Sequence, residues 1–203
     1  MNKNILAENF NLSSYTTIKV GGVAEYFAEP RNTDEFLFLI KWANLNKQRC
    51  QIIGAGSNLL INNIFIKGLV ICTKKMKTLA IEPYSGIVEA EAGVMLPTLS
   101  NALAKNGLQG GEWAVGIPGT LGGAIYMNAG TGNLSLAKNL ISVKVINNFN
   151  IREFSQFGSI SFLNDILPPI DLLERTFDYI NDKNECKISD IVNILGVSDT
   201  MTY

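Results

Sequence analysis

The sequence contains no histidine, and this absence narrows the chemistry that the chain can perform. Histidine is the side chain whose unperturbed pKa lies nearest neutrality, and it is also a common zinc ligand. Histidine-based catalytic triads and dyads, and most zinc sites, are therefore excluded. Any reaction must use carboxylates, Lys, Arg, Tyr, Ser, Cys or a bound cofactor.

Cysteine is scarce as well. Cys50, Cys72 and Cys186 are odd in number, lack CxxC spacing and lie in apolar surroundings. This pattern favours reduced thiols in a core over a disulfide framework or a metal site. The sequence therefore predicts no metal site, and it favours a cytoplasmic location.

The chain has neither a large charge of one sign nor a long hydrophobic run. It carries 17 basic and 18 acidic residues, so no overall field would recruit nucleic acid or an anionic membrane surface. No apolar run approaches the ~18 residues that span a bilayer, and the first residues lack the apolar core of a signal peptide. We therefore expect a soluble, intracellular protein without a nucleic-acid or membrane partner. Its 203 residues, 47% of them hydrophobic, suit one large domain or two small lobes with a buried core.

Glycine and charge are distributed unevenly along the chain. Residues 1–150 hold 16 of the 18 glycines, and they carry 13 basic and 9 acidic residues, a net charge of +4. Residues 151–203 carry 4 basic and 9 acidic residues, a net charge of -5. Because glycines concentrate where the backbone turns sharply or approaches something closely, ligand contact is expected in the first part.

Hydrophobic periodicity predicts a mixed fold of helices and strands. Helices are predicted over residues 32–47, where Asn32 begins a cap-like segment, and over residues 96–106, where Pro97 lies in the first turn and Gly107 follows the end. Strands are predicted at residues 50–53, 69–72, 86–92 and 141–145. The tail is expected to form two amphipathic helices, over residues 171–181 and 189–195.

The first glycine loop, residues 54–60 (GAGSNLL), directly follows a predicted strand. Its glycines let successive backbone N–H groups face one concave spot, and the Ser and Asn side chains add donors, which together form a nest for a phosphate. A simple turn between strands is the alternative interpretation. The loop is neither GxGxxG before a long helix nor GxxxxGKS, so no ordinary Rossmann or P-loop site is predicted.

The second glycine loop, residues 116–130 (GIPGTLGGAIYMNAG), has four glycines within eight residues and is stiffened by Pro118. Such a backbone can press against a flat or anionic ligand. Each glycine weakens regular structure, so a loop that only turns would rarely need two adjacent glycines followed by a small Ala124. This pattern predicts ligand contact.

These two loops and a third segment, residues 16–22 (TTIKVGG), resemble in order and separation the FAD-dependent UDP-N-acetylenolpyruvoylglucosamine reductases, the MurB family of peptidoglycan synthesis. The resemblance covers roughly residues 8–150. It implies an α+β fold, a two-lobed FAD-binding module of the vanillyl-alcohol-oxidase type. A small α/β lobe (1–73) would precede a mixed-sheet lobe (74–150), and a divergent tail (151–203) would pack on the module.

The resemblance also implies which residues hold a non-covalent FAD between the lobes. The diphosphate would lie at the first loop, on Gly54, Gly56, Ser57, Asn58 and Leu59. The flavin would lie at the second loop, on Gly116, Pro118, Gly119, Thr120, Gly122, Gly123 and Ala124. Upstream, Glu112 and Trp113 are interpreted as a cap and a packed ring. Tyr126 and Asn128 could reach either the flavin or the core.

The reaction implied by the resemblance is reduction of the enolpyruvyl double bond of UDP-N-acetylglucosamine enolpyruvate by NADPH through the flavin. In the family a Ser or Cys protonates the adjacent carbon, and an Arg and a Glu stabilise the enolate. The family's Tyr-Arg pair is absent here, since Arg152 lies too early and is expected at a solvated strand end. Residues 158–165 match the proton-donor element only with an inserted residue, and no closing Glu motif is found.

The catalytic residues and the oligomeric state therefore remain unidentified by the sequence. The first hypothesis is the reductase. The alternative is a catalytically impaired FAD-binding remnant of that family that acts as a binding module. A more distant interpretation is an oxidase or dehydrogenase of the same flavin superfamily with another substrate.

Overall fold

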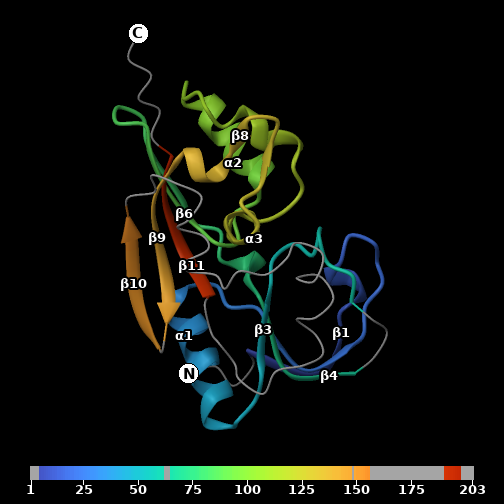
Figure 1. Ribbon diagram of the computed structural model, residues 1–203. Helices are drawn as coiled ribbons and strands as arrows, with labels where there is room; N and C mark the ends of the chain where they lie inside the picture. The colour runs from blue at the N-terminus through green and yellow to red at the C-terminus, as the bar shows by residue number, and fades with distance from the viewer. Residues whose placement is uncertain (1–4, 62–64, 148, 156–189, 198–203) are drawn as a thin grey trace.

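The structure is a computed structural model that describes residues 5–61, 65–147, 149–155 and 190–197 (Figure 1). These residues form a four-stranded sheet, a five-stranded sheet and a two-stranded ribbon, together with three α-helices and four 3₁₀ helices. The predicted α+β class is therefore confirmed. The boundaries predicted between lobes and tail, after residues 73 and 150, stay a prediction.

The first sheet has the strand order β1-β2-β4-β3. The strands β1 (Leu6–Asn11) and β2 (Val23–Ala28) are antiparallel, whereas β4 (Phe65–Cys72) runs parallel to both β2 and β3 (Cys50–Ile53). Helix α1 (Thr33–Leu45) makes the crossover from β2 to β3. The short 3₁₀ helices η1 (Ser13–Tyr15) and η2 (Thr73–Lys75) follow β1 and β4.

Helix α1 forms where the sequence predicts it. The side chain of Asn32 accepts a hydrogen bond from the backbone N of Glu35 at 2.9 Å, which satisfies one free donor of the first turn. The helix buries one apolar face, formed by Phe36, Leu39, Ile40 and Ala43. That face packs with Leu69 and Ile71 of β4 and with Ile146 of the second sheet, so α1 lies between the two sheets.

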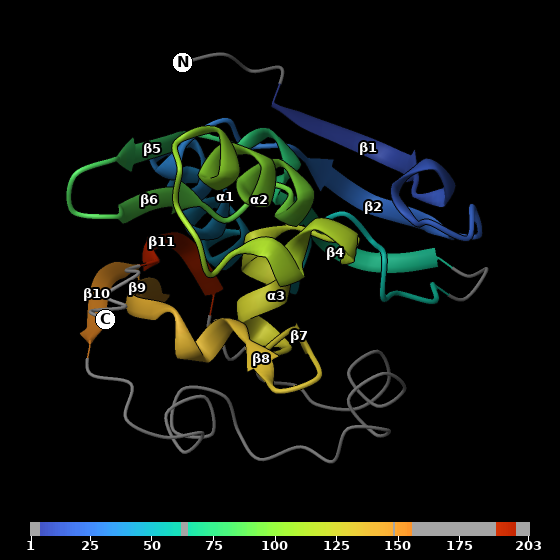
Figure 2. The same cartoon turned by 90° about the horizontal axis from the view of Figure 1, so that it is seen from above.

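The second sheet has the order β10-β9-β11-β6-β5 and is antiparallel throughout. Its strands are β5 (Leu79–Glu82), β6 (Ile87–Glu91), β9 (Leu140–Asn147), β10 (Asn150–Ser155) and β11 (Asp190–Val197). Helices α2 (Leu96–Lys105) and α3 (Leu121–Tyr126) lie on the same side of this sheet (Figure 2). The remaining elements are η3 (Glu112–Gly116), β7 (Gly130–Thr131), β8 (Leu134–Ser135) and η4 (Leu136–Lys138).

Most sequence predictions for this lobe are confirmed in position. Strands at residues 86–92 and 141–145 correspond to β6 and β9, and α2 has Pro97 in its first turn and is followed by Gly107 with φ +71°. In β9, Val143 and Val145 are buried as the alternation predicts, but Ile141 is exposed and Ser142 is buried. Exposed and buried positions therefore do not alternate strictly along β9, as they would in a strand with one side facing solvent.

The helix predicted over residues 189–195 is wrong. Residues 190–195 belong to β11, which pairs antiparallel with β9 on one side and β6 on the other, and residue 189 lies outside the described residues. Short apolar runs do not distinguish a buried strand from a helix by periodicity, and pairing with two neighbouring strands decides the conformation here. The helix predicted over residues 171–181 lies outside the described residues.

Two of the three cysteines lie in the described part of the chain. Cys72 is buried and Cys50 is half-buried, and neither is in a disulfide; Cys186 lies outside the described residues. In the same ranges, no cluster of three or more Cys, Asp or Glu residues could hold a metal ion. No described helix is long and apolar enough to cross a membrane.

Candidate cofactor site

The first glycine loop leaves the end of β3 and makes a tight bend at Gly56. The backbone of Gly56 has φ +67°, a conformation that favours glycine, and a Cβ at this position would collide with the carbonyl oxygen of Tyr15. The carbonyl oxygen of Gly56 accepts a hydrogen bond from the backbone N of Thr17 at 3.1 Å. The segment 16–22 is therefore held directly against this loop.

At this bend, several backbone donors have no partner in the described part of the chain. Within the described ranges, no acceptor is found for the N–H groups of Gly56, Ser57 and Asn58. The hydroxyl of Ser57 is already engaged, because it donates to the carbonyl oxygen of Pro118 at 3.0 Å. An anion at this loop would therefore be bound mainly by backbone N–H groups and by the exposed Asn58 side chain.

The second glycine loop is more regular than the sequence suggests, because it contains the short helix α3. Thr120 is the N-cap residue, and its hydroxyl accepts a hydrogen bond from the backbone N of Gly123 at 3.4 Å. The start of the helix is tied to residues 92–96 by three backbone bonds: Leu121 N to Val94 O at 2.7 Å, Gly122 N to Ala92 O at 2.8 Å and Leu96 N to Gly119 O at 3.0 Å.

The glycines of the two loops divide into two kinds. A Cβ at Gly54 would overlap the hydroxyl of Thr120, and a Cβ at Gly122 would lie 2.9 Å from the Cβ of Ala92. These two glycines are required by packing within the protein. By contrast, Gly116 and Gly123 are exposed. Among the described residues beyond their chain neighbours and the backbone of α3, a Cβ at Gly116 would meet nothing within 4 Å, and a Cβ at Gly123 would meet Thr120 Oγ1 at 3.5 Å.

Gly119 lies between these extremes. It has φ +143°, and a Cβ there would lie 3.2 Å from the Ser57 hydroxyl. Pro118 beside it is exposed, whereas Thr120 and Ala124 are buried, and Ala124 belongs to the apolar core of the second lobe. Only part of the flavin set implied by the resemblance therefore presents an open surface: Gly116, Pro118, Gly119 and Gly123.

The structure brings together three segments that are far apart in the sequence. The Ser57–Pro118 hydrogen bond joins residues 61 positions apart, Thr120 lies against Gly54, and Thr17 is bonded to Gly56. Six large apolar side chains of these segments and of residues adjoining them are left exposed. They are Ile18, Val20, Leu59, Leu60, Val115 and Met127.

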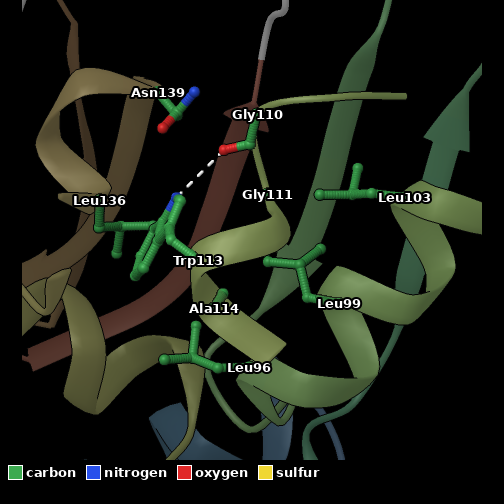
Figure 3. A pocket seen from close by; sticks show the side chains of 9 residues that line it. All are labelled: Leu96, Leu99, Leu103, Gly110, Gly111, Trp113, Ala114, Leu136 and Asn139. Carbon is green, nitrogen blue, oxygen red and sulfur yellow. Dashed lines mark hydrogen bonds between the residues drawn. The ribbon is translucent and has the colours of Figure 1, made fainter. Parts of the chain in front are cut away.

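Residues in and just before the second loop make contacts within the framework, and Tyr126, which the sequence left open, packs against the apolar core of the second lobe. Trp113 is buried in the second core, and its indole N–H donates to the carbonyl oxygen of Gly110 at 3.1 Å (Figure 3). Glu112 accepts a bond from the backbone N of Gly110 at 2.9 Å. Asn128, with φ +45°, accepts one from Ala137 N at 3.2 Å. The interpretation of Trp113 as a packed ring is confirmed, but Glu112 is not the cap of η3, because the N-cap residue is Gly111 and no side chain caps that turn.

A small cavity lies beside Trp113, between α2, η3 and η4 (Figure 3). Its wall is mostly apolar, with Asn139 the one polar side chain that reaches it, and it contains no residue of the first glycine loop. The lining residues are Leu96, Leu99, Leu103, Gly110, Gly111, Trp113, Ala114, Leu136 and Asn139. This cavity is a gap in the core, and its lining includes none of the residues that the resemblance assigns to FAD.

A cluster of polar side chains lies beside the first loop, and no pattern in the sequence indicates it. Its members are Tyr15, Glu29, Lys74 and Lys75. Burial, and then the charge and hydrogen bond of Glu29, raise the pKa of Tyr15 to about 12. Glu29 also pairs with Lys75 at 2.7 Å, and the ammonium of Lys74 lies 5.8 Å from the centroid of the Tyr15 ring. Burial raises the pKa of the Cys72 thiol to about 11, and this thiol lies 3.6 Å from the carbonyl oxygen of Gly54.

Comparison with known proteins assigns this arrangement to a class. Residues 24–148 match a family model described as an FAD binding domain. The chain therefore belongs to the family of FAD-binding domains.

The particular relatives agree with the resemblance seen in the loops. The chain is 73% identical over 145 residues to the UDP-N-acetylenolpyruvoylglucosamine reductase of Prochlorococcus marinus subsp. pastoris, covering 71% of this chain and 49% of the relative. It is 46% identical over 141 residues to the protein of that name from Synechococcus sp. (strain RCC307), covering 70% of this chain and 46% of the relative. The chain thus spans about half the length of the curated relatives it matches.

Solved structures support the fold. The UDP-N-acetylenolpyruvylglucosamine reductase (MurB) of Thermus caldophilus superposes with a TM-score of 0.64 at 22% identity, covering 96% of this chain and 62% of that one. Alkyldihydroxyacetonephosphate synthase also gives a TM-score of 0.64, at 14% identity, covering 98% of this chain and 38% of that one. The predicted flavin-module fold is confirmed.

Proposed function

We propose that the chain binds FAD non-covalently where its three glycine-containing segments meet, as the flavin-binding part of a UDP-N-acetylenolpyruvoylglucosamine reductase. One observation carries this proposal: the Ser57–Pro118 hydrogen bond holds both glycine loops together, in a chain 73% identical over 145 residues to a protein of that name. The proposal includes NADPH as hydride donor and UDP-N-acetylglucosamine enolpyruvate as substrate. It also includes a role in peptidoglycan synthesis and a location in the cytoplasm.

The residues of the site fit the two halves of the cofactor. The N–H groups of Gly56, Ser57 and Asn58 suit an anionic diphosphate, because they supply partial positive charge and have no acceptor among the described residues. The open surface at Gly119 and Gly123 suits a flat ring, because a backbone without side chains permits close approach. When bound, FAD would supply hydride transfer, and the residues of this chain would bind and orient it.

The described residues explain binding better than turnover. Arg152 is exposed in β10, opposite Val145, and lies on none of the three glycine-containing segments. Removing one group that stabilises developing charge typically costs ~100- to 1000-fold in rate. We therefore expect the chain alone to hold FAD and to reduce the enolpyruvyl substrate slowly at best. That outcome corresponds to the alternative function, a binding module of the same family.

The test begins with the purified chain, which should carry a yellow flavin that denaturation releases. Ser57→Ala should weaken FAD binding, because it removes the bond to Pro118, whereas Ser14→Ala at an exposed position should not. Protein that stays colourless after addition of FAD would refute the proposal. Anaerobic reduction by NADPH, followed by reoxidation with the enolpyruvyl substrate, then separates the reductase from the binding module. A single-turnover rate of ~1 to 1000 per second would favour the complete enzyme.

A further inference from the structure

The side chain of Thr120 is buried between the two glycine loops. It is only 1% exposed, whereas its neighbour Gly119 is half-buried and Gly123 is exposed. A side chain with almost no accessible surface cannot line a bound flavin. The resemblance nevertheless groups Thr120 with the flavin residues, so its role requires another explanation.

The contacts of Thr120 run in two directions. Toward its own loop, the hydroxyl accepts a hydrogen bond from Gly123 N and caps α3. Toward the other loop, this hydroxyl occupies the space that a Cβ at Gly54 would need, with the Cβ and Cγ2 of Thr120 at 3.3 and 3.5 Å from that position. One hydroxyl therefore defines both the start of the helix and the spacing of the two loops.

The surroundings leave Thr120 little freedom to move. It is paired with Met95 in an isolated antiparallel bridge, and the backbone groups on either side of it bond to Leu96 N and Val94 O. If Thr120 rotated to accommodate a larger residue at position 54, its hydroxyl would leave Gly123 N. Crowding at Gly54 is therefore transmitted directly to α3.

We propose that Thr120 is a positioning residue of the cofactor site, which sets the geometry of both loops through Gly54 and Gly123 without touching FAD. This inference rests on the proposed function, since it takes the two loops to hold the cofactor. It assigns to the first loop a glycine, Gly54, whose role is to admit the Thr120 side chain.

The first experiment compares two replacements of Thr120. Thr120→Val keeps the shape but removes the hydroxyl, and it should raise the Kd for FAD by about tenfold. It should also alter the visible absorption band of the bound flavin. Thr120→Ser keeps the hydroxyl and should restore both the Kd and the band shape. Thr131→Val, at an exposed position of β7, is the matched control and should leave FAD binding unchanged.

The second experiment is a double-mutant cycle. Gly54→Ala should weaken FAD binding by about tenfold or more in the wild-type background. In a Thr120→Ala background the same change should have little further effect, because the new Cβ takes the space that the hydroxyl leaves. Thermal unfolding of each variant gives the folded fraction to which the Kd values refer.

The outcomes separate the two proposals. Equal effects of Gly54→Ala in both backgrounds, or wild-type affinity in Thr120→Val, would overturn the positioning role while wild-type binding of FAD leaves the proposed function intact. If Thr120→Val does not fold, the cycle with Thr120→Ala and the Thr120→Ser rescue decide the question. Absence of FAD binding by the wild-type chain would remove the proposed function, and the positioning role with it.

Discussion

Two adjacent glycines, Gly122 and Gly123, should respond in opposite ways to the same substitution. The two residues are neighbours in α3, and the sequence alone gives no reason to treat them differently. In the structure, Gly122 faces the backbone of Ala92, whereas Gly123 is exposed. Replacing each with alanine therefore tests which glycine serves packing and which serves the ligand.

Gly122→Ala should destabilise the fold. Its Cβ would lie 2.9 Å from the Cβ and 3.1 Å from the carbonyl oxygen of Ala92, and the bond from Gly122 N to Ala92 O at 2.8 Å restricts relaxation. Overpacking of this kind costs about 1 to 3 kcal/mol, against a gain of about 0.5 to 1 kcal/mol from replacing a helical glycine. We expect a net loss of about 1 kcal/mol, within a range from about 0 to 2.5 kcal/mol, in the free energy of unfolding.

Gly123→Ala should stabilise the free protein and weaken FAD binding. Among the described residues outside the helix's own backbone, the nearest atom to the new Cβ is Thr120 Oγ1 at 3.5 Å, an ordinary contact, so the helix gains about 0.5 to 1 kcal/mol. If the flavin lies on this surface, the methyl group enters the space of the ring. We expect the Kd for FAD to rise by about tenfold, the equivalent of about 1.4 kcal/mol.

Denaturant unfolding of the free protein and fluorescence titration with FAD would measure the two effects separately. A Gly123→Ala variant that is more stable and binds FAD as tightly as the wild type would place the flavin elsewhere. A Gly122→Ala variant with unchanged stability would show that the contact with Ala92 is not as tight as the structure indicates.

Three further predictions concern the cap of α1 and the titratable side chains near the first loop. Asn32→Ala should lower the free energy of unfolding by about 1 kcal/mol, measured with denaturant, because it removes the cap on Glu35 N. Glu29→Gln should lower the pKa of Tyr15 from about 12, since the charge and hydrogen bond of Glu29 raise it after burial; an unchanged phenolate titration in the ultraviolet would contradict this. Folding raises the pKa of Cys72 from 9.0 to about 11 and the pKa of Tyr15 from 10.0 to about 12. Between pH 9 and 12 the folded state therefore binds more protons than the unfolded state, so the free energy of unfolding should fall as pH rises through this window. Unfolding midpoints that stay constant across that window would refute the assignment.

Helices α1 and α2 could be predicted because their signals are local. Asn32 is the cap of α1, and Pro97 and Gly107 mark the two ends of α2. The strands β1 and β2 gave no such signal, because their conformation comes from pairing across the sheet, as in the Leu6 and Ala28 register. The error at residues 189–195 has the same origin, since β11 forms between two partner strands.

The site could be predicted as a set of loops but not as a set of contacts. Glycine spacing located both loops, and the resemblance supplied their order. Whether a given glycine admits a ligand or a protein neighbour depends on residues distant in sequence, such as Thr120 for Gly54 and Ala92 for Gly122. The hydroxyl of Ser57 was expected to face a phosphate, yet it bonds to Pro118. No local pattern encodes these pairings.

The connection between the loops has a consequence for the stability of the whole module. The second lobe has its own apolar core, which includes α2 and α3. The first sheet contributes to two further apolar cores, one of which includes Ile146 of β9. Between the loops themselves, the described contacts are few: the Ser57–Pro118 bond and the Gly54–Thr120 packing. A ligand that contacts both loops adds free energy only to the assembled state, by RT ln(1 + [L]/Kd). FAD bound at this junction would therefore stabilise the arrangement of the loops that creates its own site.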